Sequence, residues 1–218
     1  MARSNLNSNR IKPRSSELLI LRVLRRERLS PHLARVTLGG GDVKRFVPMG
    51  YDQWFRLFLP VAADSLARLP DKLTTLGYAK FLTISKTSRP VLRNYSVRAH
   101  RPDGPEGPEL DVDFVLHGSA ADGTAGPAAV WAETCAPGGS VAIIDEGIGF
   151  NPPPATRRVV LVADESRLPA MAGSLASLPP DTTGWVVGES GLPTALRRHW
   201  VRGGVPKEHI MFCGYWRH

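Results

Sequence analysis

The segment 93–98, RNYSVR, carries the residue types and spacing that are most informative about chemistry. On an expected strand, Arg93 and Tyr95 lie two positions apart and therefore share one face. A guanidinium suits a pyrophosphate, which it can bind with two parallel hydrogen bonds. The Tyr95 ring can stack on an isoalloxazine, and the Ser96 hydroxyl can hydrogen-bond its polar edge. The pattern is compatible with a flavin site, but from these residues alone a plain surface strand with a tyrosine is the simpler interpretation.

A second signal is the expected helix that opens at Gly126, Pro127 and Ala128. Proline suits the first helical position, and the free N–H groups of a helix start attract phosphate. Small residues there let a phosphate approach closely. The helix follows a strand that ends at His117 and Gly118. A helix start of this kind is common by itself, but its position after the 93–98 segment indicates a phosphate site.

Five motifs follow one another along the chain: RNYSVR, LDVDFVLHG, GPAAVWAETCAPGGSV, ADESRLPA, and VVGES with a terminal GYWR. In these motifs, from about residue 18 to residue 218, the chain resembles the siderophore-interacting proteins. These are FAD-dependent ferric-siderophore reductases related to ferredoxin reductases. The resemblance implies a mixed β-barrel plus α/β fold, with an antiparallel FAD-binding barrel followed by a parallel α/β lobe that binds NAD(P)H. It also implies that electrons pass from NAD(P)H through FAD to a ferric siderophore.

The resemblance also implies two sets of site residues. The cofactor-binding set holds the flavin, its pyrophosphate and the pocket around them: Arg93, Tyr95, Ser96, Val97, His117, Gly118, Gly126, Pro127, Ala128 and Trp131. The second set lies beside the nicotinamide site or at the substrate mouth: Asp164, Glu165, Ser166, Tyr215, Trp216 and Arg217.

The chain departs from the family pattern in two places. Residues 119–125 separate the His-Gly pair from Gly126, where family members usually have one or two residues. In the second lobe, residues 181–184 lead straight into the strand 185–188, which indicates an internal deletion of several dozen residues. Such a deletion removes central strands of the crevice that binds dinucleotides, which argues against strong NAD(P)H binding.

The expected organisation is a flexible basic tail at 1–16, a flavin-binding barrel at 17–150 and a shortened α/β lobe at 155–218. The barrel region contains short strands separated by Gly/Pro turns, at 18–24, 35–38, 53–59, 94–99, 110–116 and 140–144. Residues 151–154 read as a linker. The lobe alternates strands and helices, at 158–163, 168–178, 185–188, 194–202 and 210–213. With three strands its core is small, so we expect it to lean on the barrel or on a second subunit of a homodimer.

Composition excludes several classes of protein. The 218 residues have 42% hydrophobic content, which is ordinary for a globular chain, and no apolar run approaches a membrane span. The net charge is 28 − 20 = +8, but the basic residues are spread along the chain, so nucleic acid is not expected as a partner. No membrane partner is expected either. Two distant cysteines form no metal motif and indicate a cytoplasmic protein.

Several residues also have a purely structural interpretation. His117 can be a hydrogen-bonded residue at a strand end, and Asp164 and Glu165 can cap the following helix. Tryptophans and cysteines can belong to the core, namely Trp131, Trp185, Trp200, Cys135 and Cys213. The last expected helix carries three arginines, Arg197, Arg198 and Arg202. They can form a solvated face or, together with Lys207 and Arg217, a basic rim for an anionic siderophore.

Three functions compete. The first is an FAD-dependent oxidoreductase that acts on a ferric siderophore, in which the flavin performs the electron chemistry. It needs no triad, no paired carboxylates and no resident metal, and the sequence suggests none. The second is a family member without productive NAD(P)H use, such as a cyclase or tailoring enzyme of natural-product biosynthesis, whose flavin is structural or reduced by an external electron donor. The third, suggested by charge alone and ranked last, is a non-enzymatic binder of anions or nucleic acid.

Overall fold

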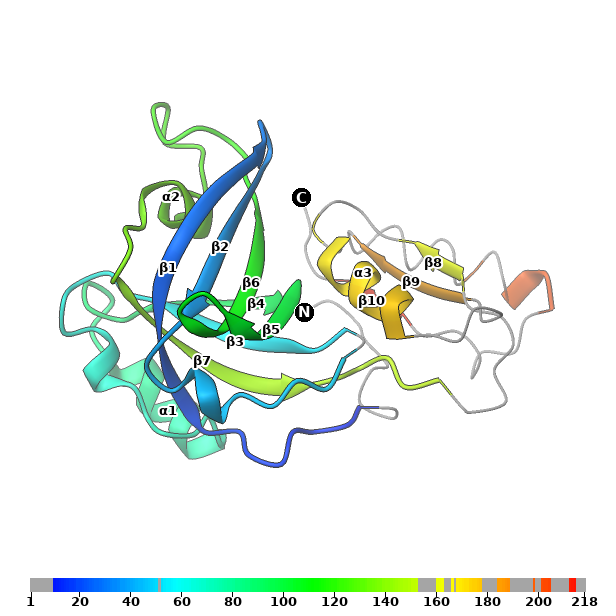
Figure 1. The fold of residues 1–218 in the computed structure, drawn as a ribbon, viewed down its shortest axis with the longest axis horizontal. Coiled ribbons are helices and arrows are strands. Elements are labelled where there is room, and N and C mark those ends of the chain that lie inside the picture. Colours follow the sequence, from blue (N-terminus) through cyan, green and yellow to red (C-terminus); the bar gives the residue numbers. More distant parts are fainter. Residues whose placement is uncertain are drawn as a thin grey trace. The chain divides into compact units, whose positions relative to one another are not determined.

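The computed structural model describes residues 10–50, 52–152, 160–162, 166, 168–177, 184–188, 198, 201–204 and 212–214 (Figure 1). The chain divides into two compact units. The larger unit consists of Lys12–Met49 and Trp54–Gly147. The other contains the described residues of Met1–Ile11, Gly50–Gln53 and Ile148–His218.

The larger unit is an antiparallel sheet of seven strands in the order β4-β3-β7-β1-β2-β6-β5. The strands are β1 (Leu18–Ser30), β2 (Leu33–Gly39), β3 (Trp54–Leu59), β4 (Val91–Ser96), β5 (Ala99–Gly104), β6 (Gly107–Val115) and β7 (Ser140–Gly147). The sheet curls so that β4 also contacts β6. The antiparallel barrel expected from the turn-rich sequence is therefore present.

Alternation along each strand builds the interior of this barrel. In β6, Leu110, Val112 and Phe114 are at most 1% exposed and belong to the main apolar cluster, with side chains from β1, β2, β3 and β7. The alternating acidic residues Glu109, Asp111 and Asp113 lie on the opposite face of the strand. Each large apolar side chain buried in this way contributes roughly 1.5–3 kcal/mol relative to exposure.

Helix α1 (Thr75–Thr83) covers a second, smaller apolar cluster on the other face of β3 and β7. The Thr74 hydroxyl caps the helix by accepting a 3.1 Å hydrogen bond from the Gly77 N–H. Phe81 packs edge-on against Phe58, with the ring centroids 5.6 Å apart. Two short 3-10 helices, η2 (Val43–Arg45) and η3 (Leu66–Arg68), complete this unit. The sequence did not predict α1.

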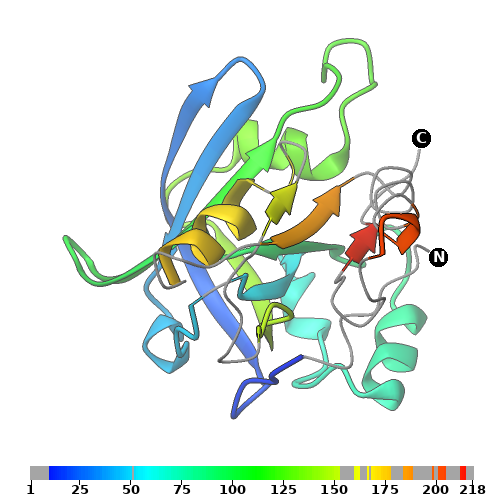
Figure 2. The same cartoon turned by 90° about the vertical axis from the view of Figure 1, so that its right-hand side faces the viewer.

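Helix α2 (Pro127–Thr134) confirms the helix expected after Gly126. Its buried residues, Ala128, Ala129 and Ala132, belong to the main apolar cluster. The β1–β2 hairpin and the loop 119–125 extend at the same end of the unit in both Figure 1 and Figure 2. Helix α1 lies at the opposite end in both views.

The other unit contains a parallel sheet in the order β10-β9-β8. Its elements are β8 (Val160–Val162), α3 (Leu168–Ser177), β9 (Gly184–Gly188) and β10 (Phe212–Gly214). They overlap the strands expected at 158–163, 185–188 and 210–213 and the helix expected at 168–178. Within the expected helix 194–202, the described residues Arg198, Val201 and Arg202 are helical.

One expected strand is corrected by the structure. The sequence suggested a single strand at 94–99, but β4 ends at Ser96 and β5 begins at Ala99. The chain changes partner there, because β4 pairs with β3 whereas β5 pairs with β6. Among the described residues, no helix has the length and apolar character needed to cross a membrane.

Candidate functional site

Strand β4 presents Arg93 and Tyr95 on one face. In the β3–β4 register they stand opposite Leu57 and Phe55, two residues of the main apolar cluster. Tyr95 is half-buried and packs against that cluster. Leu92, one position before Arg93 and so on the other face of the strand, packs instead against the cluster under α1. The expected shared face of Arg93 and Tyr95 therefore exists.

The Arg93 guanidinium is available for an anion. Its side chain is exposed, and its Nη1 donates a 2.8 Å hydrogen bond to the carbonyl of Leu92. Among the described residues, no carboxylate pairs with it. Its remaining N–H donors match the fork geometry that binds phosphate oxygens.

Burial keeps Tyr95 a neutral phenol. Desolvation raises the pKa of Tyr95 well above its usual range, and the nearby positive charge of Arg93 offsets only part of this effect. An uncharged ring beside a guanidinium can take a flat aromatic ligand without placing a negative charge against it.

Three aromatic rings join the elements of the site. The Tyr95 and Phe114 centroids are 4.4 Å apart, and the Phe114 and Trp131 centroids are 5.6 Å apart. The rings come from β4, β6 and α2 respectively, and α2 contacts both strands. Phe114 is 1% exposed and fixes the other two from the core. Trp131 is half-buried against the same cluster, in agreement with its core interpretation.

The N-terminus of α2 is open to an anion. Gly126 is the N-cap residue in extended conformation and provides no capping side chain, and the first turn contains no acidic residue. Pro127 has no N–H, so the donors of this turn begin at Ala128. A Cβ added at Gly126 would meet no atom within 4 Å. These features suit a phosphate group.

The loop 119–125 is closed by its own hydrogen bonds. The Thr124 hydroxyl donates to Asp122 Oδ1 at 2.6 Å and accepts from the Ser119 N–H at 2.9 Å. The bond from Thr124 also lowers the pKa of Asp122. Gly118 precedes the loop with φ +72, and a Cβ there would lie 2.6 Å from the backbone carbon of Thr124. The extra residues thus form a compact turn whose entry needs glycine.

The other residues expected at the cofactor are placed as follows. Ser96 is 7% exposed and, by strand alternation, lies on the opposite face of β4 from Tyr95. Val97 follows β4 and packs on the main cluster. His117 is exposed after β6. Contact of these residues with a cofactor stays a prediction.

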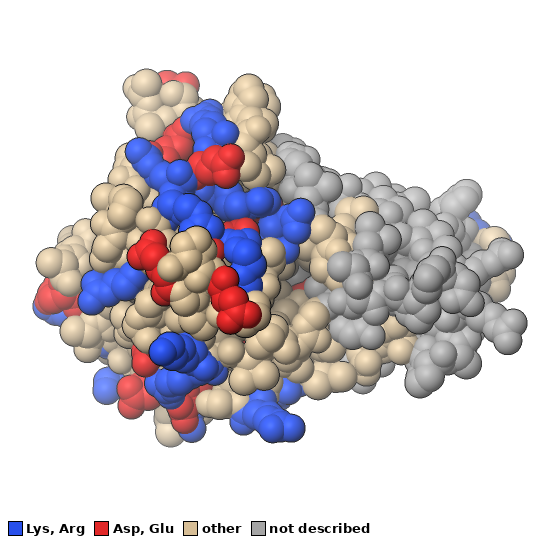
Figure 3. Space-filling view, in the orientation of Figure 1, with Lys and Arg blue, Asp and Glu red and all other residues tan. Residues whose placement is uncertain are grey.

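A row of carboxylates follows β6 outside the apolar interior. Glu109, Asp111 and Asp113 have side chains that are at most 5% exposed. Arg25 and Arg101 bind Glu109 at 2.7 and 2.9 Å. The remaining partners are Arg101 on Asp111, and Arg35 and Arg98 on Asp113. Figure 3 shows basic and acidic side chains gathered on the β1–β2 face. Sequence reasoning did not find this network, although the three acids alternate visibly along the strand.

The structure does not describe most of the residues expected at the nicotinamide site and the substrate mouth. Asp164, Glu165, Tyr215, Trp216 and Arg217 lie outside the described residues. Ser166 is half-buried in a 3-10 turn.

Of the residues with a structural interpretation, Cys135 is confirmed as a buried residue. It is 9% exposed, and burial raises the pKa of its thiol. Arg198 and Arg202 are exposed. In the described part of the chain, no group of His, Cys, Asp and Glu could hold a metal ion.

Comparisons with known proteins agree with these features. The family model of the siderophore-interacting FAD-binding domain matches residues 22–148. An uncharacterized protein of Mycobacterium tuberculosis is 37% identical over 187 residues, covering 81% of this chain and 62% of that protein. The ferric vibriobactin reductase of Vibrio cholerae is 30% identical over 174 residues, covering 77% and 56%. The chain thus spans about 60% of the length of these relatives.

Two solved structures share the fold. The first is a siderophore utilization protein from T. fusca, with a TM-score of 0.69, 21% identity and 96% of both chains covered. The second is a siderophore-interacting protein from Aeromonas hydrophila, with a TM-score of 0.67, 23% identity, and 93% of this chain and 92% of that chain covered.

Proposed function

This chain belongs to the siderophore-interacting FAD-binding domain family, and on that premise we propose that it binds FAD and reduces ferric siderophores through it. One observation supports the proposal most. Arg93 and Tyr95 lie on one face of β4, and the aromatic packing of Phe114 and Trp131 brings α2 with its uncapped N-terminus against that strand. A cation, a flat ring and free helix amides are the groups that a flavin dinucleotide requires.

The residues divide the work by chemistry. Arg93 and the first amides of α2 would hold the pyrophosphate by charge-assisted hydrogen bonds. The neutral Tyr95 ring would pack against the isoalloxazine and exclude water from that side. When bound, FAD supplies the conversion between a two-electron hydride donor and one-electron acceptors. The iron is substrate, and each ferric ion takes one electron to become the weakly held ferrous ion. No side chain has to act as an acid, a base or a nucleophile.

The second unit carries the finer part of the proposal. We assign Asp164, Glu165 and Ser166 to the nicotinamide site, and Tyr215, Trp216 and Arg217 to the substrate mouth. NAD(P)H would deliver hydride there. These assignments come from the resemblance of the motifs.

A second candidate function is favoured by the short segment between α3 and β9. Helix α3 ends at Ser177 and β9 begins at Gly184, so only residues 178–183 connect them. A connection of that length holds no additional strand and crossover helix. A smaller sheet offers less of the crevice in which dinucleotides bind. The chain would then keep FAD but rely on an external electron donor, or use the flavin in a tailoring reaction of natural-product biosynthesis.

An anaerobic titration of the FAD-loaded protein with NADPH and NADH separates the two candidates. Loss of the visible flavin absorbance on addition of one equivalent of NADPH or NADH supports a self-sufficient reductase. Unchanged absorbance in a protein that holds FAD, followed by full bleaching with dithionite, supports the second candidate. A chain that fails to retain FAD in gel filtration contradicts both.

A further inference from the structure

Helix α1 exposes apolar side chains that no described element covers. Leu76 is 83% exposed, Leu82 49% and Tyr78 42%. The opposite side of the helix is firmly held, because Phe81 packs into the cluster with Phe58 and a Cβ at Gly77 would lie 2.0 Å from a backbone oxygen. The helix therefore presents these side chains from a fixed position.

The surroundings of α1 are basic. From Lys72 to Pro102 the sequence contains no acidic residue, and Lys72, Lys80, Lys86 and Arg89 lie on or beside the helix. Lys80 has no carboxylate partner among the described residues, and Lys72 is 3.8 Å from Glu17, which also pairs with Arg45.

Lys72 and Lys80 also line one open groove. Its volume is about 540 Å³, and its other lining residues are Leu69, Pro70 and Asp71. Among the described residues of that lining, Asp71 is the one carboxylate.

We propose that α1, with Lys72, Lys80 and Lys86, docks on an anionic lipid surface. Lysines beside an exposed apolar helix face are the combination that binds at a headgroup layer, where the charges meet lipid phosphates and the apolar tips enter the acyl boundary. A protein partner is less suited. Leu76 and Leu82 lie at the two edges of the outward side of a convex helix, whereas peptide-binding sites are grooves lined by apolar residues. The groove with Lys72 and Lys80 instead fits a phosphate headgroup.

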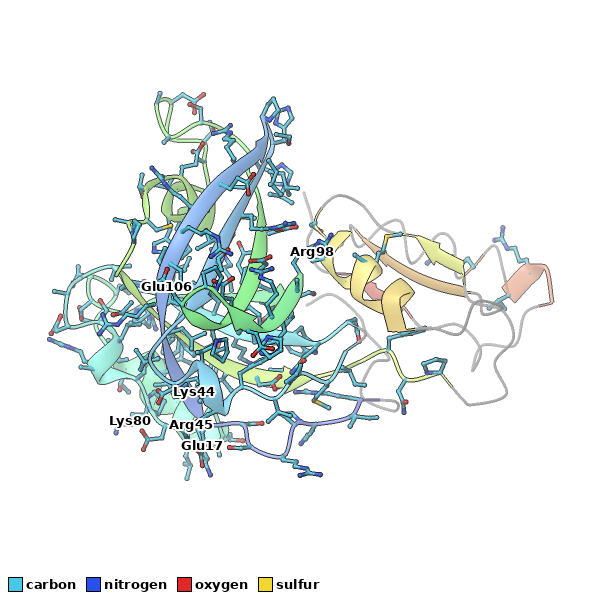
Figure 4. The ribbon with its side chains drawn as sticks, viewed as in Figure 1. Glu17, Lys44, Arg45, Lys80, Arg98 and Glu106 are labelled. Atoms are coloured by element: carbon cyan, nitrogen blue, oxygen red, sulfur yellow. The ribbon has the colours of Figure 1, made fainter. Side chains whose placement is uncertain are left out.

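This surface is separate from the candidate flavin site. In β4, Leu92 packs on the α1 side, whereas Arg93 and Tyr95 lie on the other face. In Figure 4, Lys80 lies at the outer edge of the larger unit beside α1, far across that unit from Arg98, which follows the flavin strand. Docking through α1 therefore leaves the face of β4 that carries Arg93 and Tyr95 uncovered. The sequence suggests no membrane partner because it has no apolar run long enough to span a bilayer. Binding to the surface of a membrane does not require such a run.

Vesicle co-sedimentation of the full chain tests this proposal. The probes are vesicles of phosphatidylcholine alone and of phosphatidylcholine mixed with phosphatidylglycerol. We expect binding to the mixed vesicles only, weakened by salt. Lys72→Glu and Lys80→Glu should each lower the partition coefficient at least about fivefold, and Leu76→Ser should lower it about tenfold.

Matched controls come from the β1–β2 hairpin at the opposite end of the unit. Arg26→Glu changes charge as Lys80→Glu does, and Leu29→Ser removes a leucine that is 38% exposed. Both should leave vesicle binding unchanged. The proposal is overturned if the chain ignores anionic vesicles, if the α1 variants bind as the original chain does, or if the hairpin variants lose as much binding. Circular dichroism and FAD titration of each variant separate misfolding and loss of the flavin site from loss of docking.

Discussion

The ring of Tyr95 in β4 lies 4.4 Å, centroid to centroid, from the ring of Phe114 in β6, at an interplanar angle of 43°. Phe114 is 1% exposed, whereas Tyr95 is only half-buried. A core residue therefore sets the position of a residue that faces the candidate cofactor site. Packing in the barrel interior and cofactor affinity should for this reason be coupled.

Replacing Phe114 by leucine tests this coupling. The change removes an aromatic contact on both Tyr95 and Trp131, so the free energy of unfolding should fall by about 1–3 kcal/mol. The Kd for FAD should rise as well, because Tyr95 loses its support. Phe58→Leu is the matched control, since Phe58 is equally buried but belongs to the cluster under α1. It should lower stability without altering the FAD affinity. Equal effects of both variants on the Kd would speak against the coupling.

Arg93 should be the main side-chain contributor to pyrophosphate affinity. Arg93→Ala removes charge-assisted hydrogen bonds of roughly 1.5–3 kcal/mol, so the Kd for FAD should rise about 10- to 100-fold. Arg93→Lys keeps the charge but loses the fork and should fall in between. Arg68→Ala, which removes an exposed partner of Asp64, is the control. Fluorescence titration with FAD measures all three, and an unchanged Kd in Arg93→Ala would exclude the assigned role.

Two glycines of the loop separate backbone strain from crowding. Gly118 and Gly123 have φ of +72 and +73, but only at Gly118 would a Cβ meet another backbone atom, at 2.6 Å. Gly123→Ala should cost about 1–2 kcal/mol, the ordinary penalty of the left-handed conformation. Gly118→Ala should cost more and should also displace the entry to α2. Urea unfolding of both variants gives the comparison. If Gly118→Ala lowered the free energy of unfolding no more than Gly123→Ala does, the close packing of Gly118 against Thr124 in the loop would be contradicted.

Acid should weaken the carboxylate row. Hydrogen bonds from Arg25, and then from Arg101, hold the pKa of Glu109 below its ordinary value of 4.5. A group whose pKa is lowered in the folded state adds stability above its unfolded pKa and loses it as pH falls through the folded value. Glu109→Gln should thus lower the free energy of unfolding by about 1–3 kcal/mol at pH 7.

The same argument fixes how this deficit varies with pH. It should shrink as pH falls below 4.5, because the original chain then loses the same interaction. Asp64→Asn, at an exposed pair, is the control and should show little change. Thermal unfolding across pH 3 to 7 measures both variants. A deficit that stays constant with pH would contradict the assignment.

Local patterns of the sequence predicted much of the barrel. The period-two alternation of polar and apolar residues at 110–116 predicted the strand that β6 confirms, and Pro127 marked the start of α2. The change of partner between Ser96 and Ala99 could not be read, because a strand's partner depends on residues far along the chain. The sequence did not predict helix α1, although Thr74 is a suitable N-cap residue. Its hydroxyl accepts a hydrogen bond from the N–H of Gly77, three residues later. That helix has only nine residues and carries apolar side chains on its exposed side as well as its buried side. The alternation of polar and apolar residues that marks an amphipathic helix is therefore weak.

The candidate site divides in the same way. Arg93 and Tyr95 could be proposed from the sequence because their spacing places them on one face of a single strand. The sequence did not single out Phe114, because its contacts with Tyr95 and Trp131 arise only when β4, β6 and α2 assemble. The pairing of Arg25 with Glu109 spans 84 positions and leaves no local signal.

Electron transfer from the protein-bound flavin to iron is the most direct test of the proposed function. FAD-loaded protein is reduced with one equivalent of dithionite and mixed anaerobically with a ferric siderophore in the presence of a ferrous chelator. We predict that the oxidised flavin absorbance returns as the ferrous complex forms, with two ferrous ions per FAD and faster than with free reduced FAD. A flavin that stays reduced, or that is reoxidised no faster than free FAD, would contradict the assignment as a ferric-siderophore reductase.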